Sequence, residues 1–291
     1  MSFVAGLARK YRSGLADRRL GAPFRRAADG NMLPDPDYCG EAAMRTVRVG
    51  LLAVLVGFFT LGAGPARAAE TVDVALVLAA DVSRSIDEGE FQLQRQGYAT
   101  GLTSAKVLTA IQAGTHQAIA VCFVEWSGPD EQMVVVEWTV IRDGESAGEF
   151  ASLLLAAPRS FTGRTSISGG IDFAVKQLAA SGITAERRVI DVSGDGTNNA
   201  GRAVTDARDD AVVAGVTING LAIINDRPAG YFFAHTQPPE GLPAYYRNNV
   251  IGGEGAFLQV VKDFSTFGDA ITNKLLSEIA GLRPRGQLAL R

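Results

Sequence analysis

The sequence predicts an α/β protein with a Rossmann-like, doubly wound and mostly parallel sheet, one antiparallel edge strand and helices on both faces. Apolar runs of strand length alternate with segments whose apolar residues recur at helical spacing. The first run, residues 72–80, is apolar at almost every position, as expected of a central strand covered on both faces. Two further runs, 118–124 and 132–141, are separated by turn residues at 128–130. They should therefore pair antiparallel, with the second run at the sheet edge.

The other elements follow in chain order. Asp87 and Glu90 resemble a capping box, so the first helix should begin there and continue until Gly114. Right-handed crossovers would place the loops after the parallel strands at one edge of the sheet. The same patterns predict strands at 187–192 and 217–224, and helices at 145–157, after Ser166, at 200–214 and from Phe264 to Ile279, the last ended by Gly281.

Charge and cysteine content argue against a nucleic-acid-binding protein and against a disulfide-bonded domain. The chain has 291 residues, 47% of them hydrophobic and 20% charged, which fits one domain with an extra segment. Residues 70–291 carry 18 Lys or Arg against 26 Asp or Glu, a net charge of −8 that argues against a nucleic-acid partner. Cys122 lies alone in an apolar run of this part, so we expect a buried free thiol and no disulfide.

Residues 44–68 have the three parts of a signal peptide. Arg45 and Arg48 begin it, an apolar run follows at 49–64, and Ala66-Arg67-Ala68 supplies a small-x-small cleavage site. The run of 16 residues is shorter than the ~20 that a membrane-spanning helix needs. We therefore expect a periplasmic or secreted protein without a membrane span after cleavage, and an uncleaved anchor is the alternative.

The domain itself should begin at residue 69. Residues 1–43 are rich in Arg and Gly and lack periodicity, so we expect a non-native or disordered extension, with Met44 as an alternative start. Residues 69–291 then form one domain with an insertion at about 225–255, rich in aromatic residues and proline. The insertion is either a packed flap over the last strand or a recognition surface.

Polar oxygens follow the first predicted strand at alternate positions. Asp81, Ser83 and Ser85 could turn a carboxylate and two hydroxyls toward one point, and hard cations such as Mg²⁺ prefer such oxygens. Thr165 precedes a predicted helix and Asp195 follows a predicted strand, so both could reach the same sheet edge. Each piece alone has a simpler interpretation, a turn at the strand end or a helix cap at Thr165.

Together these five residues resemble the metal-ion-dependent adhesion site (MIDAS) of the von Willebrand factor A (vWA) family. The resemblance covers about residues 70–281, and the stretches 123–127 and 245–253 resemble the bacterial exported DUF1194 family. It implies a vWA fold that binds one divalent cation, Mg²⁺ or else Mn²⁺ or Ca²⁺. The ligands would be the hydroxyls of Ser83, Ser85 and Thr165, with Asp81 and Asp195 acting partly through water.

The function that this resemblance implies is an exported, divalent-cation-dependent, adhesion-type module that binds a protein. The partner would offer a carboxylate to the cation, and aromatic residues around Tyr245 and Tyr246 would add apolar area at the rim. The sequence leaves the identity of the partner and the oligomeric state open. The alternative is a metal-independent structural domain.

Enzymatic interpretations fit the sequence less well, so we assign no catalytic or cofactor-binding residues. Gly194 and Gly196 mimic the start of a dinucleotide-binding loop, but Asn199 stands at the third glycine position. An aspartyl phosphatase would need a second carboxylate two residues after Asp81, where Ser83 stands. A serine hydrolase would need G-x-S-x-G and a nearby histidine, whereas both histidines fall in predicted surface loops.

Overall fold

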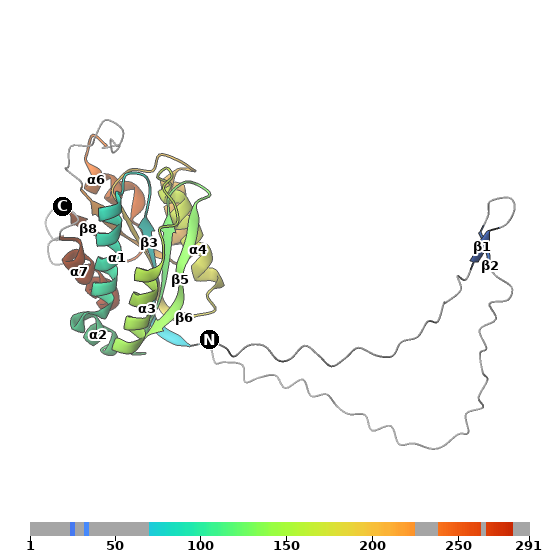
Figure 1. Cartoon of the computed structure of the whole chain (residues 1–291). Coiled ribbons are helices and arrows are strands. Elements are labelled where there is room, and N and C mark those ends of the chain that lie inside the picture. Colours follow the sequence, from blue (N-terminus) through green and yellow to red (C-terminus); the bar gives the residue numbers. More distant parts are fainter. Residues whose placement is uncertain (1–23, 27–31, 35–69, 225–237, 263–265, 282–291) are drawn as a thin grey trace, which may run out of the picture. The chain divides into compact units, whose positions relative to one another are not determined.

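The computed structural model of the protein describes residues 24–26, 32–34, 70–224, 238–262 and 266–281 (Figure 1). The chain divides into two units, residues 1–62 and 63–291. In the first unit, strands β1 (Phe24–Arg26) and β2 (Met32–Pro34) pair antiparallel. The rest of the predicted extension at 1–43 and the predicted signal peptide at 44–68 lie outside the described residues.

The second unit is built on a six-stranded sheet with the order β5-β4-β3-β6-β7-β8. Every neighbouring pair is parallel except β4 and β5, which are antiparallel. The predicted doubly wound sheet with one antiparallel edge strand is therefore confirmed. The strands are β3 (Thr71–Asp81), β4 (Ile119–Trp126), β5 (Gln132–Ile141), β6 (Thr184–Gly194), β7 (Thr217–Ile223) and β8 (Leu258–Val261).

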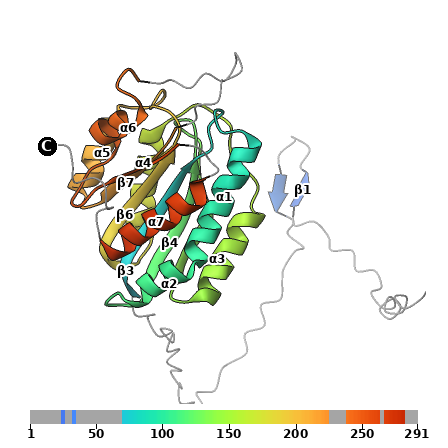
Figure 2. The same cartoon turned by 90° about the vertical axis from the view of Figure 1, so that its left-hand side faces the viewer.

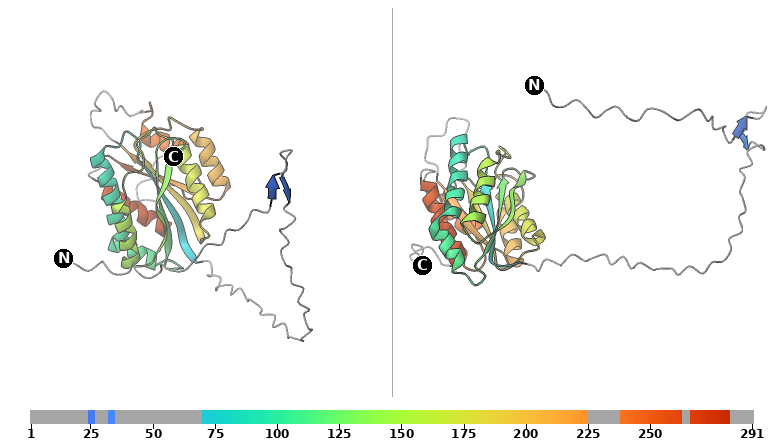
Figure 3. Two further views of the ribbon diagram at one scale, coloured as in Figure 1. Left: turned by 45° about the vertical axis from the view of Figure 1, so that its right-hand side comes forward. Right: turned by 60° about the horizontal axis from the view of Figure 1, so that its bottom comes forward.

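Helices cover both faces of this sheet. Figure 2 shows α1, α2, α3 and α7 in front of one face, and Figure 3 shows the two helical layers from two further directions. The opposite face carries α4, α5, α6 and the π-helix η1. The helices are α1 (Glu88–Thr103), α2 (Ala105–Gln112), α3 (Gly144–Ala156), α4 (Ile167–Ala180), α5 (Val204–Val213), α6 (Leu242–Tyr245), η1 (Tyr246–Val250) and α7 (Phe267–Ala280).

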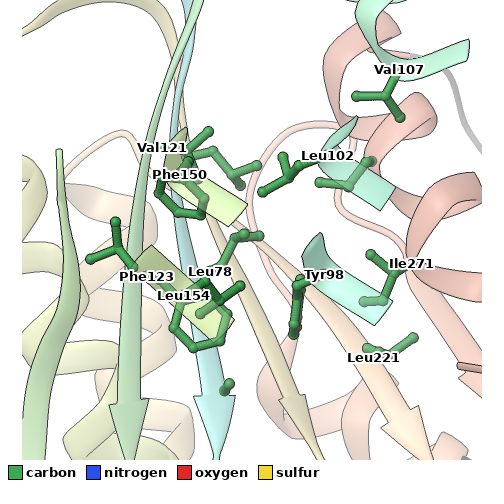
Figure 4. Close-up of a cluster of buried hydrophobic side chains, with 14 of the residues drawn as sticks. Leu78, Tyr98, Leu102, Val107, Val121, Phe123, Phe150, Leu154, Leu221 and Ile271 are labelled. Carbon is green, nitrogen blue, oxygen red and sulfur yellow. The ribbon is translucent and has the colours of Figure 1, made fainter. Parts of the chain in front are cut away.

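Strand β3 is central because its side chains feed both cores. All its residues after Thr71 are buried, and consecutive residues such as Val77 and Leu78 belong to the apolar clusters on opposite faces of the sheet. In the cluster of Figure 4, Tyr98 packs edge-on against Phe123, with the ring centroids 5.1 Å apart. Full burial of a Val, Leu, Ile, Phe or Met side chain stabilises the fold by roughly 1.5–3 kcal/mol. The strand that leads to the predicted site is thus held rigidly on both sides.

Several helix boundaries differ from the predictions, and two of the differences have a local cause in the structure. The first predicted helix is two helices, because Ser104 adopts an extended conformation between them. The Ser104 amide donates to Gly101 O (3.2 Å), and its hydroxyl accepts from Val107 N (3.3 Å) as the cap of α2. Helix α5 begins at Val204 and not at residue 200, because residues 196–203 form the loop that binds the segment before α4.

The described part of the insertion is folded onto the sheet. Leu242, Tyr246 and Val250 are buried in the same core cluster as α4 and α5. The packed-flap interpretation therefore fits residues 238–255, whereas 225–237 lie outside the described residues. The expectation that Tyr246 adds apolar area to an exposed rim is wrong, because its side chain is fully buried.

Two other expectations concern single residues and helix length. Cys122 is a buried free thiol, as predicted. None of the helices in the described ranges is long and apolar enough to cross a membrane.

Candidate metal centre

Three loops meet at the C-terminal edge of the sheet: one after β3, one before α4 and one after β6. Main-chain hydrogen bonds join them. Arg84 N in the first loop donates to Gly163 O in the second (3.0 Å), and Asn199 N in the third donates to Thr165 O (2.9 Å). The loops are therefore fixed relative to one another by their backbones, independently of the side chains that they present.

All five predicted residues come together at this edge, and their oxygens form one hydrogen-bonded cluster. Asp81 Oδ1 accepts from Ser83 N (2.7 Å), and the Ser83 and Ser85 hydroxyls lie 3.1 Å apart. Ser85 Oγ donates to Asp195 Oδ1 (2.7 Å), and Thr165 Oγ1 donates to Ser83 Oγ (3.3 Å). Asp81 and Asp195, more than a hundred residues apart in the sequence, come close together because β3 and β6 are parallel neighbours whose ends share one edge.

The cluster is buried and carries two acidic groups. Asp81 and Asp195 are both fully buried, and Ser83 is nearly so. Burial, and then the charge of Asp195, raise the pKa of Asp81 to about 8, against the opposing effects of the Ser83 amide and Arg159. A cation placed between the two carboxyl groups would favour their ionised forms.

Arg159, which the sequence reasoning missed, holds the first loop by its main chain. Its Nη2 donates to Val82 O (2.7 Å) and Ser83 O (2.8 Å), and its Nε donates to Phe161 O (2.9 Å). The guanidinium also stacks on the ring of Phe91, 5.6 Å from its centroid. No periodicity or motif marks this arginine, since its role depends on carbonyl groups that a sequence does not display.

Two asparagines after Asp195 position the second loop. Asn199 Oδ1 accepts from Thr165 N (3.1 Å), and Asn198 Oδ1 accepts from Ser168 N (3.0 Å). Asn198 N in turn donates to Tyr245 Oη (3.1 Å). The run of polar residues that ends in Asn198 and Asn199 was a signal for these contacts, since short amides commonly bind nearby backbone groups.

A buried ion pair supports the end of β4 beside the site. Arg95 Nη2 lies 2.6 Å from Glu125 Oε1, and both side chains are almost completely buried. Glu125 Oε2 accepts from Ser160 N (2.8 Å), which ties β4 to the segment after α3. Arg95 also donates to Leu154 O at the end of that helix.

The buried side chain of Tyr246 lies next to Asp81 and Gly194. Its hydroxyl and Asp81 Oδ2 are both buried, and neither has a hydrogen-bond partner among the described residues. A Cβ on Gly194 would stand 2.7 Å from Tyr246 Oη and 3.0 Å from Asp81 Oδ2, so both groups lie over the same bare backbone. Burial, and then the charges of Asp81 and Asp195, keep the pKa of Tyr246 well above its usual value. The phenol is therefore a hydrogen-bond donor on the acidic side of the cluster.

The donor set suits a hard divalent cation. Hydroxyl and carboxylate oxygens are the ligands of Mg²⁺, Mn²⁺ and Ca²⁺, and the cluster contains neither a thiol nor an imidazole. The buried Asp81 Oδ2, with no partner in the described part of the chain, is an acceptor that a cation or its bound water would satisfy.

A family model described as protein of unknown function (DUF1194) matches residues 71–283. The chain belongs to the DUF1194 family. The match spans nearly the whole second unit, including all five clustered residues and Tyr246. No protein of curated function matches this DUF1194 sequence.

Solved structures similar to the DUF1194 domain include a vWA protein. Proximal thread matrix protein 1 from the mussel byssus aligns with a TM-score of 0.52 and 13% identity over 72% of this chain and 48% of that one. A vWA protein from Catenulispora acidiphila aligns with a TM-score of 0.50 and 14% identity over 72% and 43%. The pilus adhesin SpaC from Lactobacillus rhamnosus GG, in its open conformation, gives 0.50 and 14% over 72% and 30%.

These similarities establish the fold. The DUF1194 domain has a vWA fold, as the sequence resemblance implied, and it spans about half or less of the length of each of these proteins. Another structure of the mussel protein has zinc in its MIDAS motif.

Proposed function

We propose that this DUF1194 protein is an exported, divalent-cation-dependent module that binds another protein through a MIDAS-type site. The observation that carries the proposal is the convergence of five oxygen-bearing residues, two of them fully buried aspartates, at one sheet edge. In this proposal the cation is Mg²⁺, or else Mn²⁺ or Ca²⁺, and its ligand set is Asp81, Ser83, Ser85, Thr165 and Asp195.

The residues divide this task by chemistry. The hydroxyls of Ser83, Ser85 and Thr165 would contact the cation with neutral oxygens, and Asp81 and Asp195 would supply negative charge, partly through bound water. Mg²⁺ retains water readily, so one position can pass to an anionic oxygen from outside. Because three of the ligands are neutral, the bound cation would keep enough positive charge to attract that oxygen.

The surface around the cluster supports a carboxylate-bearing partner. Arg84 and Arg164 are exposed on the first and second loops, next to the clustered residues. They add positive charge to a site rim in a domain whose residues 70–291 have a net charge of −8. Rim charges of this kind mainly steer association and select the partner, and add less to affinity.

Binding is a better interpretation than catalysis for this site. Histidine, the most common acid–base group, is not beside the proposed cation among the described residues, because His116 lies at the opposite end of β3 near Asp73. The proposal of export rests on the signal-peptide pattern at 44–68, whose residues lie outside those that the structure describes.

Calorimetric titration of Mg²⁺ and Mn²⁺ into the purified protein tests the cation site. We expect binding in the parent and in Asp130→Ala, an exposed aspartate on the β4–β5 turn, and none in Asp81→Ala. The Asp81→Ala protein should remain folded, because this side chain belongs to neither apolar cluster. Equal Mg²⁺ affinity in Asp81→Ala and the parent would refute the site.

Capture of partners from an extract of the native host tests the binding function. We expect proteins that are retained by the parent and by Thr162→Ala, an exposed threonine, but released by a chelator and not retained by Thr165→Ala. Partners retained equally under all conditions would instead favour the metal-independent structural domain, in which the hydrogen-bonded cluster only holds the loops together.

A further inference from the structure

A histidine and two carboxylates come together at the edge of the sheet opposite the MIDAS-type cluster. They are Asp73 near the start of β3, His116 in the segment before β4, and Glu186 near the start of β6. Each offers one ligand atom, and these atoms all lie within 4.8 Å of one another. His116 Nε2 lies 3.3 Å from Glu186 Oε1. Three distant points of the chain therefore present one nitrogen and two oxygens to a single point.

The carboxylate of Asp73 is held in place by the segment that carries the histidine. Asp73 Oδ1 accepts from His116 N (2.9 Å), and Oδ2 accepts from Ala118 N (3.3 Å). A Cβ on Gly114 would stand 2.3 Å from Oδ2, so the backbone approaches the carboxylate more closely than a side chain would permit. Gln117 has φ of 53°, which is unusual for a residue other than glycine. The segment thus wraps tightly around a buried acidic group.

The exposure of the three side chains suits a site that can exchange its metal with solvent. Asp73 is 7% exposed, whereas the side chains of His116 and Glu186 are 29% and 51% exposed. The buried aspartate is fixed, while the other two can move by the small amount that coordination requires. Ligand atoms about 2.0–2.2 Å from a tetrahedral zinc stand ~3.4 Å apart, a spacing that the present separations allow.

We propose that Asp73, His116 and Glu186 bind one Zn²⁺, with water completing the coordination. An imidazole with two carboxylates favours zinc over Mg²⁺, since Mg²⁺ prefers oxygen ligands alone. The site lies about 26 Å along β3 from Asp81, at about 3.3 Å per residue. It is therefore separate from the MIDAS-type cluster, and it does not depend on the function proposed for that cluster.

Zinc at this position would cross-link the start of β3, the start of β6 and the segment before β4. These elements are joined in the described structure by strand pairing and by the contacts of Asp73. A ligand that binds only the folded chain stabilises it in proportion to the logarithm of its concentration. The melting temperature should therefore rise with zinc concentration through this site.

The test uses the full protein with Asp81→Ala, which removes the other cation site, and zinc competition with a chromophoric chelator. We expect one bound Zn²⁺. His116→Ala and Glu186→Gln should each weaken it at least about tenfold, because loss of even an outer partner of a metal ligand costs about 10–100-fold. The matched controls are His235→Ala, the other histidine of the chain, and Glu149→Gln, an exposed glutamate on α3. Both controls should keep the parental zinc affinity.

A second measurement adds Co²⁺ to the protein with Asp81 in place. Its outcome does not depend on whether the Asp81→Ala variant folds. We expect visible absorption bands from imidazole-bound Co²⁺ that persist in excess Mg²⁺ and disappear in His116→Ala. Absence of zinc binding in the Asp81→Ala protein, or zinc affinity and Co²⁺ bands unchanged by His116→Ala, would overturn the proposal.

Discussion

The hydroxyl of Tyr246 and the carboxylate of Asp81 approach each other across the bare backbone of Gly194. The first residue comes from the insertion and the second from the end of the central strand, so the insertion forms the rear wall of the proposed cation site. Buried polar groups without partners are rare in folded proteins, and two at one place call for a common explanation. We expect the Tyr246 hydroxyl to donate toward Asp81 when the cation is bound, directly or through a water.

Tyr246→Phe should weaken Mg²⁺ binding by about tenfold, as expected when a metal ligand loses an outer hydrogen bond. The free energy of unfolding without the cation should stay the same or rise, because the hydroxyl has no partner among the described residues. Calorimetry and urea denaturation measure the two effects. Unchanged Mg²⁺ affinity would show that the hydroxyl has no part in positioning Asp81.

Gly194→Ala should lower the free energy of unfolding by about 1–3 kcal/mol, because the added methyl group would overlap the hydroxyl oxygen of the buried Tyr246 and the carboxylate of Asp81. Mg²⁺ affinity should fall with it. Gly148→Ala in α3 is the matched control: nothing lies within 4 Å of its new Cβ, so it should stabilise the helix by about 0.5–1 kcal/mol. Equal stability of the two variants in urea would contradict the packing described around Gly194.

Glu125→Ala should lower the free energy of unfolding by about 3–5 kcal/mol, because it leaves the guanidinium of Arg95 buried without its carboxylate. Asp172→Ala, which removes one partner of the half-exposed Arg202, should cost no more than about 1 kcal/mol. Thermal and urea unfolding provide the comparison. Similar losses in both variants would mean that the Arg95–Glu125 pair is solvated.

Cys122 should be unreactive toward thiol reagents in the native protein at pH 8, because burial raises the pKa of its thiol to about 12. The unfolded chain loses this proton at a lower pH, from a thiol with a pKa of about 9. Stability should therefore be independent of this group below about pH 9 and fall as the pH rises above it. Cys122→Ala should lack this component of the slope. Rapid native labelling at pH 8 would contradict the burial.

The sequence predicts best those features that depend on local pattern. Strand β5 occupies 132–141 as predicted, because its apolar run follows a clear turn. The convergence of Asp81 and Asp195 was also predictable, since the ends of parallel strands share one edge. In contrast, β8 was missed: its four residues follow a glycine-rich stretch and are too few to show a period.

Features that depend on packing between distant segments were not predictable. The break at Ser104 lies within a run whose apolar spacing continues on both sides, so only the cap contacts reveal it. Tyr246 was assigned to a rim because the insertion carries no period that would indicate its inward face. Arg159 binds carbonyl groups, and every residue has one, so its partners cannot be identified from residue types.

The two outer strands of the sheet have a consequence for how another chain could attach. Strand β8 has only four residues, and the pairing of β5 with β4 is irregular between Val121 and Val124. Short or bulged edge strands are poor templates for an added strand, and so they discourage edge-to-edge aggregation. The edge strands β5 and β8 therefore offer another chain few regularly spaced backbone groups for strand pairing. These edges favour partners that bind through side chains at the loop end of the sheet over partners that add a strand to it.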